Sequence, residues 1–257
     1  MSFAHNVRTL FCASVLSLST LGAGVAQAAD EEAMQLRVGT ESAYAPFEFT
    51  DNGTLTGFDI DLMNAVGEAM GAEVEWVQMS FDGLIPALLT SQLDMAIASF
   101  TVTEERAKRI NFSDPYYRSG VTFVIRESDK DKYTTAESLK GQRICAQLGS
   151  VSAMKAETFS PGNVATFNDA YASYLELKSG GCEAVLNDRP VNLFFMASKG
   201  SDGLVEIDDL MDAEDMAMVV PKNNPELLQK VNAALKTIRD NGTYQKIYDK
   251  WFKQAAK

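Results

Sequence analysis

The stretch "ASFTVTEERAKRINFSDPYY", from Ala98 to Tyr117, places an arginine just after a strand-like run of apolar and hydroxyl residues. Arg106 has two interpretations. It is either a solvated charge in the first turn of a helix, paired with Glu104 or Glu105, or a cation aimed at a ligand. A guanidinium has a planar fork that binds a carboxylate through two parallel hydrogen bonds, so the second interpretation implies recognition of an anionic group.

Polar residues follow other strand-like stretches in the same way. In open parallel α/β sheets, ligands bind outside the carboxyl ends of the strands, where loops and helix N-termini gather. Polar residues at those ends are therefore candidates for one shared binding cleft. The candidates are Glu41, Ser42, Ser99, Thr101, Gly149, Ser150, Asn187 and Asp188.

Strand-like and helix-like stretches alternate along the chain, which predicts an α/β fold with parallel sheets. In residues 57–71, apolar side chains recur three or four apart before Gly71, where a helix stop is expected. The alternation starts again after residue 120, and no linker rich in proline or serine separates the two parts. Two similar units without a linker indicate two lobes joined by strands that cross directly between them.

The N-terminal residues show the pattern of a secretory signal peptide. A short region with a single arginine precedes an apolar run rich in small residues, and an A-x-A cleavage site follows at 26–28. We expect cleavage after Ala28 and export of the mature chain. Two alternatives are a transmembrane anchor, which usually needs about 20 strongly apolar residues, and lipidation of Cys12, which Leu10 and Phe11 precede instead of small residues.

Composition excludes several function classes. The chain has 257 residues, and 35 acidic against 23 basic residues give a formal net charge of −12. This balance argues against nucleic acid or an anionic membrane as partner, since both reward clustered Lys and Arg. His5, the only histidine, lies in the predicted signal peptide, so histidine-based triads and histidine-containing metal sites are excluded from the mature chain.

Two cysteines, Cys145 and Cys182, remain in the predicted mature chain. Two thiols in an exported protein favour a disulfide. If the strands that they open are parallel neighbours, the pair can reach the Cα separation of roughly 4.4 to 6.8 Å that a disulfide needs. The alternative is two buried free thiols.

Several stretches resemble the periplasmic solute-binding proteins (family 3) of polar amino acid ABC transporters, in particular the glutamine-binding and the lysine/arginine/ornithine- and histidine-binding proteins. The resemblance runs from about Gln35 to Phe252, in order and at matching spacing, which makes it more specific than any single motif. The stretches are "VGTESAYAPFEF", "GFDIDLMNAV", "FDGLIPALLTSQLDMAIASFTVTEERAKRINFSDPYYRSG", "EAVLNDRP" and "LKTIRDNGTYQKIYDKWF".

The resemblance implies a type II periplasmic binding protein fold: two lobes, each a mixed and mostly parallel sheet flanked by helices, that close on a ligand about a two-strand hinge. One lobe is expected at 30–116 plus 218–257, the other at 121–213, and the hinge near 117–120 and 214–217. The implied role is capture of a free amino acid in the periplasm, as a monomer without cofactor or metal. The implied partners are an inner-membrane permease and its ATPase.

The resemblance also assigns roles at the two ends of an amino acid. Arg106 matches the arginine that holds the ligand α-carboxylate, and Ser99 and Thr101 match residues that add donors to it. Asp188 matches the aspartate that accepts from the α-ammonium, which would be costly to bury without a counter-ion. Ala98 lies where relatives use a backbone carbonyl as a further acceptor.

Two aromatic residues, Tyr44 and Phe81, match those between which the ligand side chain lies in the family. The chain departs from its relatives around that side chain. Glu41 replaces an aspartate, and Gln147 and Asn187 stand where the glutamine binder has a lysine and a histidine. The predicted ligand-binding set is Glu41, Tyr44, Phe81, Ala98, Ser99, Thr101, Arg106, Gln147, Val151, Asn187 and Asp188.

Glu41 lacks the lysine and histidine neighbours of the glutamine binder. This favours a cationic ligand tail, because burial of a carboxylate against a neutral tail costs more. We therefore expect a basic amino acid (arginine, lysine, ornithine or histidine), with glutamine as the second candidate. A dehydratase-type enzyme on the same fold, and a sensor or surface antigen, are remote alternatives, since fold alone does not decide function.

Overall fold

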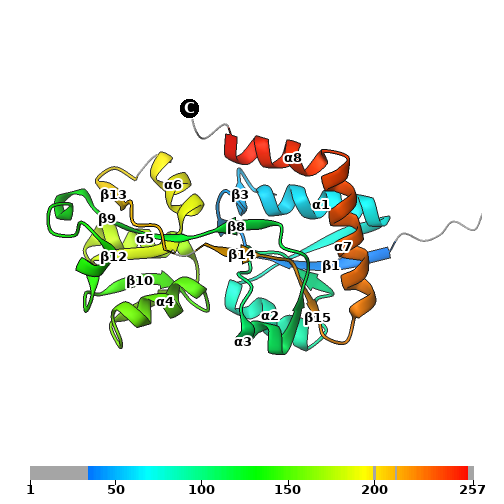
Figure 1. Cartoon of the computed structure of the whole chain (residues 1–257), viewed down its shortest axis with the longest axis horizontal. Coiled ribbons are helices and arrows are strands. Elements are labelled where there is room, and N and C mark those ends of the chain that lie inside the picture. The colour runs from blue at the N-terminus through cyan, green and yellow to red at the C-terminus, as the bar shows by residue number, and fades with distance from the viewer. Residues whose placement is uncertain (1–33, 199–200, 212, 254–257) are drawn as a thin grey trace, which may run out of the picture. The chain divides into compact units, whose positions relative to one another are not determined.

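The computed structural model describes residues 34–198, 201–211 and 213–253. The predicted signal peptide, its cleavage site and the alternatives to it lie outside these residues. Within them, two five-stranded sheets form the centres of two lobes (Figure 1). No helix in this part of the chain combines the length and the apolar character that a membrane crossing requires.

The first lobe is built on a sheet whose strands come from both ends of the described chain. Its strands are β1 (Met34–Thr40), β5 (Ala72–Gln78), β6 (Met95–Ala96), β7 (Ile110–Phe112) and β15 (Val219–Pro221). Its helices are α1 (Phe58–Met70), α2 (Phe81–Leu89), α3 (Glu104–Arg109), α7 (Pro225–Asp240), α8 (Thr243–Tyr248) and a π-helical turn (Asp249–Lys253). The order is β5-β1-β6-β15-β7, and β15 alone runs against its neighbours.

Consecutive apolar side chains of the central strands pack on both faces of this sheet, since successive side chains of a strand point to opposite faces. Ile97 and Val220 belong to one apolar cluster with residues of α1 and α7. Ala96 and Val219, one position away, belong to another cluster with residues of α2. The helix predicted at 57–71 is confirmed as α1, and Gly71 ends it in the left-handed conformation with φ of 67°.

The second lobe repeats this plan. Its strands are β9 (Val121–Arg126), β10 (Ile144–Gln147), β11 (Val164–Phe167), β12 (Ala184–Asp188) and β13 (Leu204–Ile207). Its helices are α4 (Val151–Phe159), α5 (Ala170–Ser179), α6 (Arg189–Ala197) and the 3₁₀ turns Glu127–Asp129 and Ala136–Leu139. The order is β11-β10-β12-β9-β13, and β9 alone is antiparallel to its neighbours. The predicted fold, two lobes with mixed and mostly parallel sheets, is confirmed.

The predicted disulfide between Cys145 and Cys182 is present, with Cα atoms 6.1 Å apart. β10 and β12 are parallel neighbours, as that prediction required. The bridge lies in the apolar cluster that also holds residues of α5 and α6. It therefore ties together the start of two central strands on one face of the second lobe.

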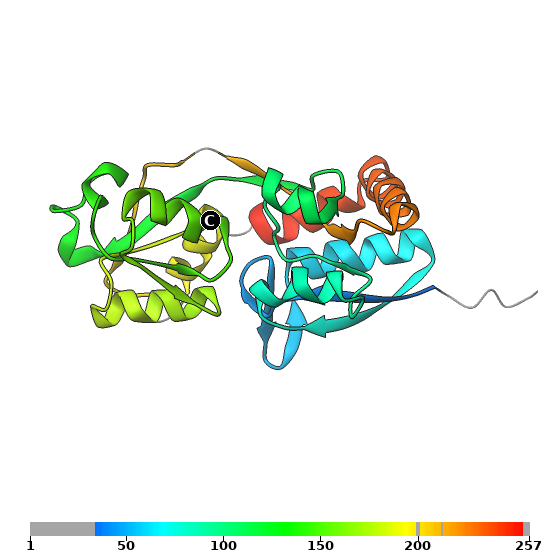
Figure 2. The ribbon, with the colours of Figure 1, turned by 90° about the horizontal axis from the view of Figure 1, so that it is seen from below.

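Two short strands pass side by side between the lobes (Figures 1 and 2). β8 (Tyr117–Ser119) and β14 (Glu214–Met216) pair antiparallel, with Tyr117 opposite Met216. A small three-stranded sheet, β2 (Ala43–Tyr44), β3 (Glu48–Asp51) and β4 (Thr54–Thr56), follows β1. The predicted lobe and hinge boundaries stay a prediction, and β8 and β14 are the elements that they concern.

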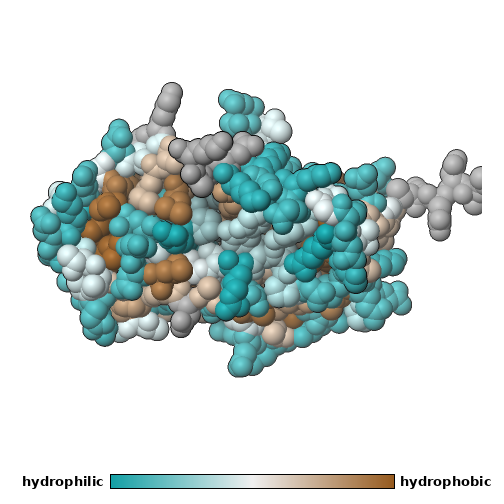
Figure 3. Space-filling view, turned by 45° about the horizontal axis from the view of Figure 1, so that its top comes forward, coloured by the Kyte–Doolittle hydropathy of each residue, from teal (hydrophilic) through white to brown (hydrophobic). Residues whose placement is uncertain are grey.

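The surface differs between the lobes. In Figure 3 the largest hydrophobic patches lie at the left of the view, over the second lobe. Large apolar side chains exposed in that lobe include Leu148, Met154, Leu175 and Leu193. Apolar exposure is therefore concentrated on α4, α5 and α6 and on the loop before α4.

Candidate ligand-binding site

One cavity is lined by residues of both lobes. Every residue of the predicted ligand-binding set lines it, with Asn187 as the exception. The first lobe contributes Glu41, Tyr44, Phe81, Ala98, Ser99, Thr101 and Arg106, and the second lobe contributes Gln147, Val151 and Asp188. The polar residues that follow β1, β6, β10 and β12 thus meet at one place, as expected for the carboxyl ends of parallel strands.

The segment between β6 and α3 forms one wall. Ser99 adopts a positive φ of 47°, which is uncommon for a residue with a side chain, and its backbone N–H donates to Asp59 Oδ2 at 2.9 Å. Thr103 caps α3, since its hydroxyl accepts from the backbone N–H of Arg106. This cap fixes the turn from which the Arg106 side chain extends.

Arg106 is only 8% exposed. Its guanidinium donates to the carbonyl of Thr101 at 2.9 Å and, across the lobes, to the carbonyl of Gly149 at 3.1 Å. Its Cζ lies 5.3 Å from the centroid of the Phe81 ring. Among the described residues it forms no ion pair, and burial lowers its pKa to about 10 although Asp188 acts in the opposite direction. A buried, uncompensated cation thus faces the cavity.

Asp188 forms the opposite wall at the end of β12, directly before α6. Its Oδ2 lies 2.5 Å from the hydroxyl of Tyr44, which comes from the first lobe. Burial raises the pKa of Asp188 to about 6, while the Tyr44 hydrogen bond and Lys155 act to lower it. No ion pair to Asp188 occurs within the described ranges, so this carboxylate also lacks a direct counter-ion.

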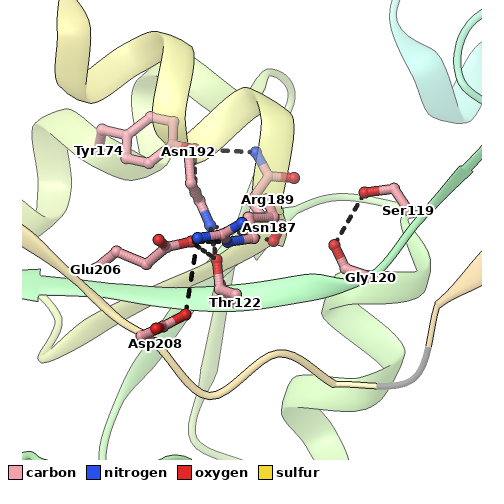
Figure 4. A network of polar contacts seen from close by, with 9 residues as sticks. All are labelled: Ser119, Gly120, Thr122, Tyr174, Asn187, Arg189, Asn192, Glu206 and Asp208. Carbon is pink, nitrogen blue, oxygen red and sulfur yellow. Dashed lines mark hydrogen bonds and ion pairs between the residues drawn. The ribbon is translucent and has the colours of Figure 1, made fainter. Parts of the chain in front are cut away.

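Asn187 faces a different set of groups (Figure 4). Its amide donates to the Tyr174 hydroxyl at 3.2 Å, and that hydroxyl donates to Asn192 Oδ1 at 2.5 Å. Asn192 in turn donates to the Thr122 carbonyl and to the backbone carbonyl of Asn187 itself. Asn187 is linked to the cavity through Tyr44, because its Oδ1 lies 2.7 Å from the Tyr44 hydroxyl.

Glu41 also lines the cavity and is 3% exposed. Its Oε2 accepts from Gln147 Nε2 at 2.7 Å, a hydrogen bond between the lobes. Burial raises the pKa of Glu41 to about 8, and Asp169 and Asp59 add to this rise while Gln147 opposes it. A cation placed here would reverse that shift, because an opposite charge favours the ionised carboxyl.

Other lining residues were missed by sequence reasoning. They are Ser119, Val121, Ser152 and Glu214. Ser119 and Glu214 belong to the crossing strands β8 and β14, whose short sequences carry no recognisable period. Ser150 did stand among the polar residues after β10, and it caps α4 by accepting from the N–H of Ala153. Glu214 pairs with Lys155 at 2.7 Å.

The arrangement suits a small zwitterion. One wall presents a guanidinium and hydroxyls, and the other presents a carboxylate without a cation, so a molecule with both charges would satisfy both walls. The part of the chain that the structure describes contains no group of three or more potential metal ligands.

Comparison with known families fits this geometry. Residues 36–254 match the model of the bacterial extracellular solute-binding proteins, family 3. The chain belongs to this family. An L-arginine-binding protein of Pseudomonas aeruginosa is 36% identical over 250 residues, covering 93% of this chain and 92% of that protein. The L-cystine-binding protein TcyJ of Escherichia coli is 29% identical over 261 residues, covering 98% of each chain.

Solved structures of solute-binding proteins show the same fold. An ancestral arginine-binding protein bound to arginine superposes with a TM-score of 0.80 at 41% identity, covering 85% of this chain and 98% of that one. The ancestral arginine-binding protein bound to glutamine has a TM-score of 0.81, also at 41% identity, covering 85% and 97%. The predicted family and fold are confirmed, and the roles of individual site residues stay predictions.

Proposed function

We propose that this solute-binding protein captures a free basic L-amino acid between its lobes. The observation that carries the proposal is the pair of buried, opposite charges, Arg106 and Asp188, which line one cavity and have no ion-pair partner among the described residues. An α-carboxylate would pair with Arg106 through its fork, and an α-ammonium with Asp188. Ser99 and Thr101 would add donors on the carboxylate side.

We propose that Glu41 determines the specificity for the ligand side chain. It is buried, accepts one hydrogen bond from Gln147 and has no cationic partner within the described part of the chain. A guanidinium, ammonium or imidazolium would supply the missing charge, and Tyr44 and Phe81 offer faces for its stem. The arginine-binding relatives support this choice.

Glutamine is the second candidate. The ancestral arginine-binding protein was solved with glutamine bound. A neutral tail would leave Glu41 without a cation, so Glu41 would keep its proton and donate a hydrogen bond instead. We infer binding and not catalysis, because the family to which the chain belongs consists of solute-binding proteins.

The proposed function also implies a cellular location and partner proteins. A solute-binding protein of an ABC importer would act in the periplasm after loss of its signal peptide, close as a monomer about β8 and β14, and present the ligand to a permease with its ATPase. Direct contacts already link the lobes: Tyr44 to Asp188, and Arg106 to Gly149. These support closure around a ligand that touches both walls.

Mass spectrometry of ligand released from natively purified protein tests the proposal. We expect arginine, lysine, ornithine or histidine in the denatured supernatant at close to one molecule per protein. The Arg106→Ala variant, purified alongside, should release far less. Release of glutamine alone would favour the second candidate, and release of no amino acid from a folded protein, together with failure to bind any added, would contradict the function.

A further inference from the structure

Two acidic side chains lie side by side in the interior of the first lobe, behind the cavity wall. Glu48 begins β3 and Asp59 lies in the first turn of α1, and both are fully buried. The backbone N–H of Asp59 donates to the carbonyl of Phe47 at 2.8 Å, which brings the start of α1 against the start of β3. Each of the two carboxyls in turn acts on the pKa of the other. Neither residue lines the ligand cavity, so the proposed binding chemistry does not account for them.

The hydrogen bonds of Asp59 are divided between its two oxygens. Oδ2 accepts from the backbone N–H of Ser99 at 2.9 Å and from the hydroxyl of Tyr116 at 2.7 Å. Oδ1 has no donor among the described residues, and neither has either carboxyl oxygen of Glu48. A carboxyl proton is the one donor that these two neighbouring groups can themselves supply.

We propose that Glu48 and Asp59 share one proton, and that this pair positions Ser99 and thereby shapes the carboxylate end of the ligand site. The proton resides on Glu48 and is donated to Asp59 Oδ1, which leaves Asp59 ionised and accepting from Ser99 and Tyr116. The inference rests on the proposed function for its effect on affinity, but the proton-sharing itself does not.

Ser99 needs such a partner. Its positive φ of 47° is a strained conformation for a residue with a side chain, and strain of this kind persists only where surrounding contacts determine it. The Asp59 bond to its N–H is buried and therefore strong. Ser99 lines the cavity, so a change in its backbone position would alter the ligand site.

Electrostatics around the pair favour a shared proton. Burial raises the pKa of Glu48 well above its ordinary value, and it raises that of Asp59 only to about 6, since Tyr116 and the Ser99 N–H stabilise the Asp59 carboxylate. No ion pair from either acid to a cation occurs in the described residues. The titratable groups that act on the pair are Glu41, Tyr116, Asp188 and Tyr244.

Loss of the proton at alkaline pH would place two negative charges in contact within a dry interior. The Asp59 carboxylate would move away from Glu48 and release the Ser99 N–H. Ligand affinity should then fall on the alkaline side. Glu48→Gln keeps a donor toward Asp59 but cannot ionise, so it should remove this component of the pH dependence.

The test is an NMR and affinity titration of the mature protein between neutral and alkaline pH. In wild type, the labelled side-chain carboxyl carbon of Glu48 should report a protonated acid at pH 7, and the Ser99 amide signal should shift when that proton is lost. In Glu48→Gln, the Ser99 amide should stay fixed, and arginine affinity at pH 7 should remain within about threefold of wild type. Glu68→Gln, an exposed change on α1, should behave as wild type.

Glu48→Leu removes the donor and keeps the volume, and it should lose roughly tenfold to a hundredfold in arginine affinity at pH 7. If this variant does not fold, the comparison of wild type with Glu48→Gln decides. An ionised Glu48 at pH 7, or a Ser99 amide that titrates alike in both proteins, would overturn the inference. If wild type binds no amino acid, the proposed function fails, while the Glu48 carbon and Ser99 amide still decide whether the proton is shared.

Discussion

Arg106 and Asp188 are both almost fully buried, and neither forms an ion pair within the described residues. Burial of a charge without a partner is costly, so each would be stabilised by an opposite charge in the cavity. A zwitterion supplies both charges in one molecule. Two strand ends that lie far apart in the sequence, each followed by charged residues, therefore meet at one cavity.

Replacement of Arg106 by alanine should weaken ligand binding by several kcal/mol, because the ligand carboxylate would be desolvated without its two-pronged donor. Calorimetric titration of Arg106→Ala with the cognate amino acid measures the loss. Lys108→Ala, an exposed residue of the same helix, is the control and should bind as wild type does. Near-unchanged affinity of Arg106→Ala would remove Arg106 from the site.

The raised pKa of Glu41, about 8, predicts proton-linked binding. At pH 7 the ligand-free carboxyl is mostly protonated, and a cationic tail favours the ionised form, so binding should release a proton. Affinity should accordingly increase as pH rises from 6 toward 8. Calorimetry in two buffers with different ionisation enthalpies measures the proton count, and Glu41→Gln should bring it close to zero. Equal proton release by wild type and Glu41→Gln would refute this role.

How much of the site could be predicted varies from residue to residue. The family motif fixed the positions of Arg106 and Asp188, but not the cross-lobe bond of Arg106 to Gly149, which depends on how the lobes pack. Asn187 and Asp188 are consecutive in β12, where successive side chains point to opposite faces. Asp188 therefore lines the cavity, while Asn187 turns toward Tyr174 and Asn192.

Individual elements were predicted best where a periodic apolar pattern and a clear end coincide. α1 has apolar residues at helical spacing and Gly71 as its stop, so its bounds were predicted closely. α6 was not predicted, although Pro190 lies in its first turn, where proline is well suited to a helix. The 3₁₀ turn Ala136–Leu139 is too short for apolar periodicity to distinguish it from an α-helix.

The disulfide should stabilise the second lobe without contributing to ligand recognition. Cys145 and Cys182 are 37 residues apart in sequence and close a loop that contains α4, β11 and α5. The double variant Cys145→Ala/Cys182→Ala should lose about 2 to 4 kcal/mol in free energy of unfolding. Chemical denaturation, with wild type under reducing conditions for comparison, measures this loss.

Affinity of the folded double variant should stay within a few-fold of wild type, because neither cysteine lines the cavity. A stability equal to that of oxidised wild type would show that the bridge adds nothing. A large loss of affinity in a fully folded double variant would instead show that the disulfide contributes to ligand binding.

The contacts between the lobes were the feature hardest to predict from the sequence, since they join residues far apart in the chain. Tyr44 meets Asp188, and Glu41 meets Gln147. A ligand held by both walls should therefore couple the unfolding of the two lobes. At a ligand concentration of about one hundred times Kd, the free energy of unfolding should rise by roughly 2.7 kcal/mol.

Urea denaturation followed by two probes measures this coupling. Tryptophan fluorescence reports on Trp76 and Trp251 of the first lobe, and a spectroscopic label on an exposed position of α5 reports on the second. Both transitions should shift together to higher urea on addition of ligand. A ligand-induced shift confined to one of the two probes would mean that the ligand binds a single lobe.

Isothermal titration of ligand-free protein with arginine, lysine, ornithine, histidine and glutamine shows directly whether the site prefers a basic amino acid. We expect saturable one-to-one binding of at least one basic amino acid, with glutamine at least tenfold weaker, and loss of the basic ligand's advantage in Glu41→Gln. Tight binding of glutamine with no detectable binding of any basic amino acid would contradict it.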